Sequence, residues 1–255
     1  MLIVISPAKT LNMLPEASSS FYSTPSQLNK SQELVEVLKK KNSKQLEKLM
    51  GISTKLAQLN YERFQQWHLP YNSNEAKQAI LAFRGDVYSG IDIDSFTDDQ
   101  LEYTQDHLRI LSGLYGVLKP MDLILPYRLE MGTPISVGKN KNLYEFWKGI
   151  ITNEIEKAIL TQNDKILINL ASNEYFKSID KRKLGATIIT PVFKDNKNGQ
   201  YKIISFFAKK ARGMMSRFLL QNKIGNVEDL KHFEEDGYFF NEEMSTEARP
   251  TFTRG

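Results

Sequence analysis

The sequence predicts a mixed α/β fold, an α+β arrangement in which a mixed β-sheet is surrounded by helices. Two predominantly apolar runs, Leu2–Ser6 and Lys165–Leu170, are typical of strands that are buried on both faces of a sheet. Segments with helical periodicity separate the strand-like runs, as they do in α/β chains. The 255 residues are 41% hydrophobic, which is enough for a substantial core, and contain no internal repeat or linker. We therefore expect one domain that spans residues 1–255.

Hydrophobic periodicity places the individual elements. Strands are expected at Leu2–Ser6, Lys165–Leu170, Ala186–Phe193 and Tyr201–Phe206. Helices are expected at Gln32–Lys40, Lys44–Leu49, Thr54–Gln66, Asn74–Phe83, Asn142–Leu160, Ala208–Leu220 and Val227–Glu235. Two sequences have the form of a capping box, in which a Thr and a Gln three residues later close the first turn of a helix. These two sequences are Thr24-Pro-Ser-Gln27 and Thr97-Asp-Asp-Gln100.

The composition excludes several classes of site. The chain has no cysteine, so disulfides, thiolate nucleophiles and cysteine-bound metals are excluded. Its three histidines, His68, His107 and His232, lack metal-type spacing, and no phosphate-loop or dinucleotide motif occurs, so we expect no metal and no cofactor. The N-terminal apolar run has only four residues, and no window reaches transmembrane length. We expect a cytoplasmic protein.

Charge is unevenly distributed along the chain. Between Asn196 and Val227 there are seven Lys and Arg residues and no acid, although the net charge of the whole chain is only +4. The segment Gly85–Leu108 holds seven acids and no Lys or Arg, and Glu228–Ala248 holds eight acids and one Lys. Segregated charge creates a surface field that attracts a partner of opposite sign.

The basic segment contains SFFAKKARGMMSRF, Ser205–Phe218, in which helical spacing brings apolar residues together on one stripe. That stripe consists of Phe207, Ala211, Met214, Met215 and Phe218. The rest of the helix carries four cations, which are Lys209, Lys210, Arg212 and Arg217. These cations are expected to bind phosphates, with Lys210 and Arg217 acting together. The alternative is that they pair with the two acidic segments, or extend from a core helix to water.

The segment Gln45–Asn60 predicts a tight hairpin between two helices, Met50-Gly51-Ile52-Ser53 forming the turn. Helix-hairpin-helix modules bind DNA phosphates through backbone N–H groups at the start of the second helix. The predicted module covers about residues 44–66. Its contact residues would be Gly51, Ile52, Ser53, Thr54 and Lys55, with Ser53 as N-cap in place of a second glycine. A plain helical hairpin that packs on the core is the alternative.

Polar residues follow two of the expected strands. Ser6 and Lys9 come after the first strand, and Asn169 and Glu174 come at the end of the second. Ligands often bind at the carboxyl ends of parallel strands. An enzyme that acts here on a small phosphorylated or nucleotide-like substrate is therefore an alternative function. Arg128 and Glu130 form a polar pair in an apolar run. This pattern indicates either a buried salt bridge between them or a contact of Arg128 with phosphate.

Blocks along nearly the whole chain resemble the YaaA family of peroxide stress proteins, in the family's order and up to the terminal PTFTRG. The blocks are ISPAKTL, GISTKLAQLN, FRGDVYSG, LRILSGLYGVLKPMDLILPYRLEMGT, LYEFW, NLASNEYF and IISFFAKKARGMMSRF. The resemblance implies a cytoplasmic bacterial protein of the response to hydrogen peroxide, linked to limiting free intracellular iron and to DNA protection. It also implies a fold particular to the family, in which a helix-hairpin-helix and a basic cleft bind duplex or distorted DNA.

The resemblance implies no catalytic residue, but it assigns conserved basic positions to the DNA-binding surface. In this chain those positions are Lys9, Arg84, Arg128, Lys209, Lys210, Arg212 and Arg217. The sequence therefore predicts a protein that binds DNA through its phosphate backbone without strong sequence specificity.

Overall fold

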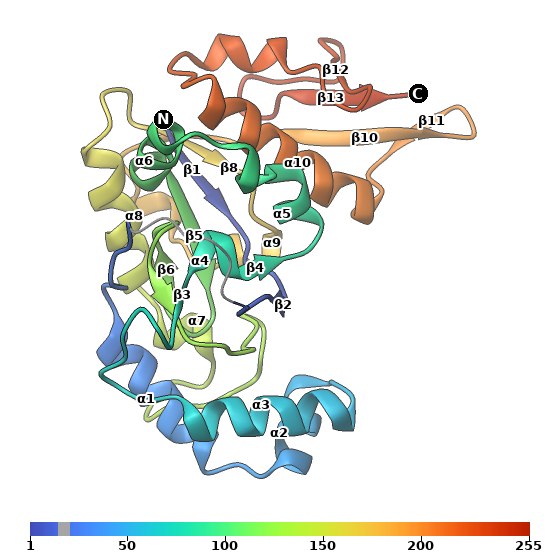
Figure 1. Ribbon diagram of the computed structural model, residues 1–255. Coiled ribbons are helices and arrows are strands. Elements are labelled where there is room, and N and C mark those ends of the chain that lie inside the picture. Colours follow the sequence, from blue (N-terminus) through green and yellow to red (C-terminus); the bar gives the residue numbers. More distant parts are fainter. Residues whose placement is uncertain (15–20) are drawn as a thin grey trace.

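The computed structural model describes residues 1–14 and 21–255 (Figure 1). A five-stranded mixed sheet forms the centre of the molecule. Its strands, in spatial order, are β6 (Gly116–Leu118), β5 (Leu108–Ser112), β1 (Leu2–Ile5), β8 (Ile166–Asn169) and β9 (Thr187–Ile189). β1 pairs in parallel with both β5 and β8, and only β6 runs antiparallel to its neighbour. All four residues of β1 are buried, as its uniformly apolar sequence predicts.

A second mixed sheet of four strands lies beside the first. Its order is β11 (Gln200–Lys202), β10 (Val192–Lys197), β13 (Thr251–Arg254) and β12 (Phe239–Phe240). Two short ribbons complete the described β-structure. They pair β2 (Thr10–Leu11) with β4 (Phe83–Arg84), and β3 (Lys77–Gln78) with β7 (Leu123–Ile124). The predicted α+β class is confirmed, with the strands divided among several sheets.

Two of the four expected strands differ from the observed ones. The run Ala186–Phe193 is not one strand, because β9 ends before Thr190-Pro191 and β10 continues in the other sheet. Proline lacks the N–H that a continuous ladder requires. The run Tyr201–Phe206 is a strand only up to Lys202, since Ser205 already begins a helix. The prediction also missed β5, the central neighbour of β1.

The long helices lie close to their predicted positions. They are α1 (Leu28–Lys39), α2 (Ser43–Met50), α3 (Thr54–Gln66) and α10 (Ser205–Gln221). α6 (Asp98–His107) begins with the predicted capping box, since the Thr97 side chain accepts from Gln100 N–H and the Gln100 side chain accepts from Thr97 N–H. The capping box at Thr24 is wrong, because α1 begins after Gln27 and has no side-chain cap.

The remaining helices are α4 (Ala79–Ala82), α5 (Asp86–Ile91), α7 (Leu143–Phe146), α8 (Ile150–Leu160) and α9 (Asn173–Phe176). α5 and α9 were not predicted from the sequence, and the other three are shorter than expected. The expected helix Asn142–Leu160 is interrupted at Gly149, whose φ of 81° is not helical. The expected helix Asn74–Phe83 is mostly β3 and α4, and Val227–Glu235 forms the 3-10 helix η3 (Val227–His232). Two further 3-10 turns are η1 (Ile93–Ser95) and η2 (Lys181–Lys183).

α10 packs closely on α5 through two glycines. A Cβ atom added to Gly213 would lie 1.9 Å from the carbonyl oxygen of Val87, and one added to Gly90 would lie 2.3 Å from that of Lys210. Only hydrogen atoms fit at this crossing. The apolar side of α10 also faces the core, with Ala211, Met214 and Met215 buried, whereas Phe207 at the predicted end of the stripe is exposed. This packing fixes which cations of α10 face which neighbours.

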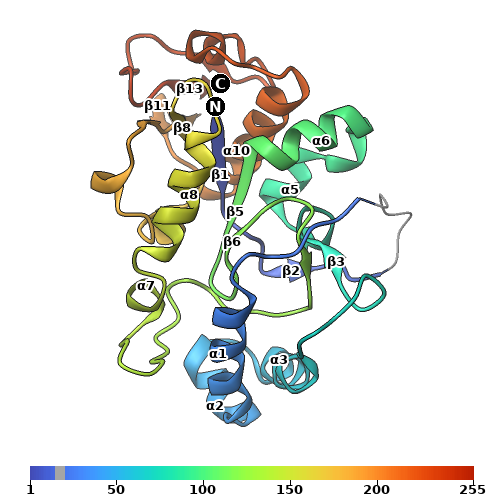
Figure 2. The same ribbon diagram turned by 90° about the vertical axis from the view of Figure 1, so that its left-hand side faces the viewer.

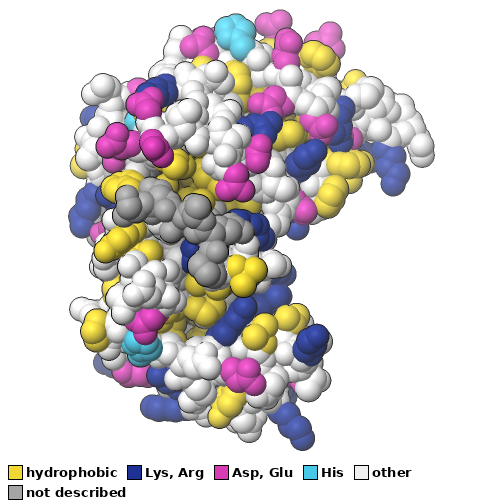
Figure 3. Space-filling model, viewed as in Figure 1, with side chains coloured by type: hydrophobic (Ala, Val, Ile, Leu, Met, Phe, Trp, Pro, Cys, Tyr) yellow, Lys and Arg dark blue, Asp and Glu magenta, His cyan; other side chains and the backbone are white. Residues whose placement is uncertain are grey.

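The hairpin of α2 and α3 lies at one end of the molecule, and the four-stranded sheet lies at the other (Figures 1 and 2). Between α10 and this hairpin the surface is hollowed, and Lys and Arg side chains gather along the hollow (Figure 3). None of the helices formed by residues 1–14 and 21–255 has the length and apolar character that crossing a membrane requires.

Candidate nucleic-acid interface

A cavity of about 400 Å³ lies at the carboxyl ends of β1 and β8. Ser6 and Lys9 reach it from the segment after β1, and Ser172 and Glu174 reach it from the segment after β8. Parallel strands end at the same edge of a sheet, so residues far apart in sequence meet there. Ser6 joins the two segments, because its hydroxyl accepts a hydrogen bond from the Ser172 N–H at 2.8 Å.

Five of the seven predicted basic residues line this cavity. They come from four separate segments and are Lys9, Arg84, Arg128, Lys209 and Arg212. The short β2–β4 ribbon sets Thr10 opposite Arg84, which brings Arg84 to Lys9. Three carboxylates, Asp86, Glu130 and Glu174, also line the cavity. Cations therefore outnumber acids around the cavity by five to three.

Glu130 links two of the cations. Its carboxylate accepts from Lys9 Nζ at 2.8 Å and from Arg128 Nη2 at 2.9 Å. The predicted Arg128–Glu130 salt bridge is confirmed. One donor is left over, since Arg128 Nε is buried and has no hydrogen-bond partner among the described residues. A buried donor without a partner costs free energy.

Lys209 and Arg212 have no carboxylate partner among residues 1–14 and 21–255, unlike the other two cations of α10. Burial lowers the pKa of Arg212, and no neighbouring acid opposes that effect. The guanidinium remains charged, because arginine keeps its proton in proteins. The described structure thus holds a partly buried positive charge that nothing nearby neutralises.

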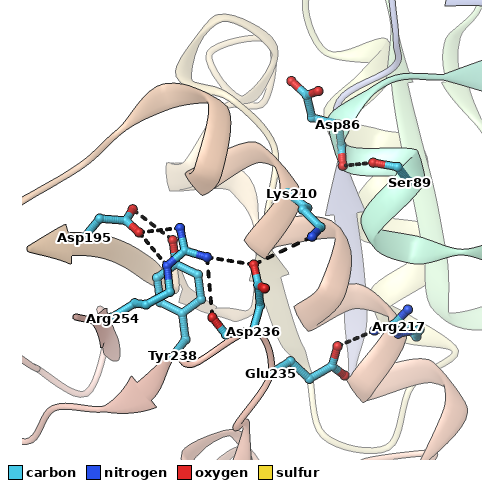
Figure 4. A network of polar contacts seen from close by, with 9 residues as sticks. All are labelled: Asp86, Ser89, Asp195, Lys210, Arg217, Glu235, Asp236, Tyr238 and Arg254. Atoms are coloured by element: carbon cyan, nitrogen blue, oxygen red, sulfur yellow. Dashed lines mark hydrogen bonds and ion pairs between the residues drawn. The ribbon is translucent and has the colours of Figure 1, made fainter.

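Lys210 and Arg217 are different, because the two acidic segments supply them with partners. Figure 4 shows the partners from the second segment, Glu235 and Asp236. Lys210 Nζ lies 3.7 Å from Asp236, and Arg217 pairs with Glu235 and, at 3.6 Å, with Asp92. The alternative that the cations pair with the acidic segments therefore holds for these two residues. Their contact with DNA stays a prediction that requires phosphates to compete with these acids.

The helical hairpin has the local features that the sequence predicts. Gly51 ends α2 with a φ of 60°, in the left-handed region, and the Ser53 side chain caps α3 by accepting from Leu56 N–H at 3.4 Å. Thr54 and Lys55 are exposed, whereas Leu46 and Phe64 are buried in the core. One side of the hairpin therefore packs on the protein and the turn is open to solvent. Contact of Gly51, Ile52, Ser53, Thr54 and Lys55 with DNA stays a prediction.

The sequence analysis missed one cation of the hairpin. Arg63 of α3 is partly buried, and both its burial and the positive charge of Arg128 lower its pKa. The hairpin and the cavity are therefore close enough for these two guanidinium groups to repel one another. Only the tertiary structure shows this, because Arg63 lies within an ordinary helical pattern with no distinguishing motif.

The alternative cluster of Ser6, Lys9, Asn169 and Glu174 is only partly assembled. Asn169 does not line the cavity, since its side chain accepts from Ala171 N–H and donates to Thr190 Oγ1. Glu174 does line it and accepts from Gly132 N–H at 2.8 Å. Within the described residues, no three His, Asp or Glu side chains are grouped as metal ligands would be.

A larger cavity of about 880 Å³ lies near the N-terminal end of β1. His107, Arg109, Asp122 and Glu154 are among the residues that line it, so it carries both signs of charge. None of the predicted site residues contributes to it. The smaller cavity, where the predicted cations meet, is therefore the candidate site.

Comparison with known proteins assigns the chain to a family. Residues 1–244 match the family model described as peroxide stress protein YaaA. The chain belongs to the YaaA family of peroxide stress proteins. This YaaA-family chain is also 52% identical over 254 residues to a UPF0246 protein of Shewanella amazonensis, and 53% identical to one of Shewanella oneidensis. Both alignments cover 100% of the chain and 99% of the relative. Membership associates the protein with the response to peroxide and confirms the resemblance.

Proposed function

We propose that this YaaA-family protein binds duplex or distorted DNA through the phosphate backbone, without strong sequence specificity, during peroxide stress. The binding surface is the hollow between α10 and the hairpin of α2 and α3 (Figure 3). DNA bound there is protected when peroxide is present, and we link this role to the limitation of free intracellular iron that the family resemblance implies.

The observation that carries the proposal is the gathering of cations from separate segments around one cavity in this region. Lys9, Arg84, Arg128, Lys209 and Arg212 line that cavity, and Arg63 of the hairpin lies close enough to Arg128 for their charges to interact. A phosphate backbone supplies a row of anions, and its neutralisation releases condensed counterions. Contacts of this kind position a protein on DNA without reading its sequence.

The salt dependence of DNA binding tests the proposal. Replacing Lys209 and Arg212 together by Gln should flatten the slope of log K against log salt by roughly 1–2, because each phosphate contact contributes about −0.9 on duplex DNA. The measurement is fluorescence anisotropy of a labelled duplex between about 50 and 200 mM salt. Affinity should fall alike for duplexes of different sequence.

Two control variants accompany this measurement. Lys165→Gln removes an exposed cation that precedes β8, at the other end of the strand from the cavity, and should leave the slope unchanged. The double variant Lys210→Gln with Arg217→Gln should change the slope less than the first pair does, because acids already accompany these two cations. An unchanged slope in a folded Lys209 and Arg212 double variant would show that the proposed surface does not contact DNA.

A further inference from the structure

We propose that the cavity at the carboxyl ends of β1 and β8 binds the phosphate and the nucleoside of a single nucleotide, with Lys209 and Arg212 of α10 as the principal phosphate ligands. This nucleotide site is distinct from the proposed binding of a DNA backbone along the hollow, because a cavity of about 400 Å³ is far too small for a duplex. It rests on the composition of the cavity and does not require that the protein bind duplex DNA.

Two cations of α10 at the cavity point to an anion. Arg212 is partly buried, and neither Arg212 nor Lys209 has an ion-pair partner among the described residues. Guanidinium groups donate several hydrogen bonds in one plane and match the oxygens of phosphate well. The Lys209 ammonium lines the same cavity and adds a second charge. A phosphate group bound there would neutralise both cations.

The other walls of the cavity suit a nucleoside. The volume lies within the roughly 300–1,000 Å³ of small-molecule sites and leaves space beyond a phosphate ion. Three tyrosines, Tyr88, Tyr127 and Tyr175, contribute to the lining, together with the buried Leu129 and Leu170. Aromatic and apolar side chains are the usual partners of a nucleobase. Burial raises the pKa of Tyr88 and of Tyr175 well above the ordinary value, so both phenols are uncharged.

Carboxylates at the cavity restrict how the ligand is oriented. Glu130 is already held by Lys9 and Arg128, and Glu174 accepts from Gly132 N–H. Both acids repel a phosphate placed beside them. Asp86 of α5 also lines the cavity, but no ion pair joins a described acid to Lys209 or Arg212 of α10. We therefore place the phosphate on the side of α10 and the nucleoside toward the tyrosines.

Isothermal titration calorimetry with AMP and with adenosine tests this site. The full-length protein should bind AMP saturably and adenosine at least tenfold more weakly, because adenosine lacks the phosphate. Arg212→Gln should weaken AMP binding several-fold. Lys209→Gln, which changes an exposed side chain, should do the same, and Lys165→Gln should leave AMP binding unchanged. The Lys209 variant keeps the test valid if Arg212→Gln fails to fold.

Equal binding of AMP and adenosine, no binding of AMP, or equal losses in the Arg212, Lys209 and Lys165 variants would each overturn the proposal. Where AMP does bind as expected, a competition experiment identifies the source of the nucleotide. If a 5′-phosphorylated single strand displaces AMP, the site binds a nucleotide of DNA. If the strand fails to displace AMP, the site binds free nucleotides. Failure of duplex binding with intact AMP binding would refute the proposed function and leave this site standing.

Discussion

At the scale of single residues, the cations of α10 differ in whether a carboxylate lies beside them. Arg217 pairs with Glu235 and Asp92, whereas Arg212 is partly buried and forms no ion pair with a described acid. Burying a charge without a partner destabilises the folded state, and a ligand of opposite charge removes that cost. Residues kept for binding are often unfavourable for stability in the free protein.

Replacing Arg212 should therefore stabilise the free protein. We expect Arg212→Gln to raise the Tm by about 2–4 °C, the shift that roughly 1 kcal/mol produces in a chain of this size. Differential scanning calorimetry without nucleic acid measures it. As the matched control, Arg217→Gln loses two ion pairs and should lower the Tm or leave it unchanged. A drop in Tm for Arg212→Gln as large as that for Arg217→Gln would contradict the absence of a partner for Arg212.

At the scale of elements, the hairpin depends on the backbone of one residue. Gly51 adopts a φ of 60°, which favours glycine, and this conformation turns the chain from α2 into the capped start of α3. No atom lies within 4 Å of a Cβ added there, so a substitution acts through the backbone conformation and not through a steric clash. The direction in which the first N–H groups of α3 point follows from this turn.

Gly51→Val should destabilise the hairpin by about 1–2 kcal/mol, the cost of a left-handed conformation for a residue with a side chain. If the turn contacts phosphate, Gly51→Val should also weaken DNA binding while the fold persists. Gly51→Asn is the matched control, because asparagine tolerates this conformation, and it should behave like the wild type. Urea unfolding and DNA titration of both variants measure the two effects. Normal DNA binding by a folded Gly51→Val variant would show that the hairpin does not bind DNA.

At the scale of the whole molecule, the two acidic segments partly neutralise the basic one. Asp92 and Asp99 come from the first acidic segment and pair with Arg217 and Lys223. Glu235 and Asp236 come from the second segment and pair with Arg217 and Lys210 (Figure 4). The field that reaches DNA is therefore weaker than the seven basic residues of the segment would produce alone. Asp236 also links the C-terminal sheet to α10. Its carboxylate accepts from Arg254 Nη1 of β13 at 2.7 Å and lies 3.7 Å from Lys210 Nζ of α10.

Removing the acids that cover α10 should strengthen DNA binding. The double variant Glu235→Gln with Asp236→Asn removes the partners that the second acidic segment supplies to Arg217 and Lys210, while Asp92 stays 3.6 Å from Arg217. We expect tighter binding and a salt slope steeper by roughly 1–2. The asparagine suits the position, because Asp236 has a φ of 54°. Glu228→Gln with Asp229→Asn removes two acids of the same segment, which lie beside Lys231 and His232, and provides the control for net charge. Equal effects of both variants would mean that Lys210 and Arg217 do not reach DNA.

Local features of the chain were predictable from sequence. The turn at Gly51, the Ser53 cap, the bounds of α3 and the capping box at Thr97 follow from interactions within a few residues. The buried strands β1 and β8 followed from their uniform apolarity. Family membership also followed from the sequence, since the blocks that carry it are continuous.

The sequence by itself determined that the chain is an α+β protein of the YaaA family with segregated charge and a helical hairpin. Only the tertiary structure decided which cations are free to bind, because ion pairs such as Lys210–Asp236 join residues far apart in the chain. It also decided that Lys9, Arg84, Arg128 and Arg212 share one cavity, and that Arg63 lies near it while Asn169 does not line it. The physical reason is that charge pairing and burial depend on distance in space. The packing of α10 against α5 through Gly90 and Gly213 sets that distance, and no local pattern encodes it.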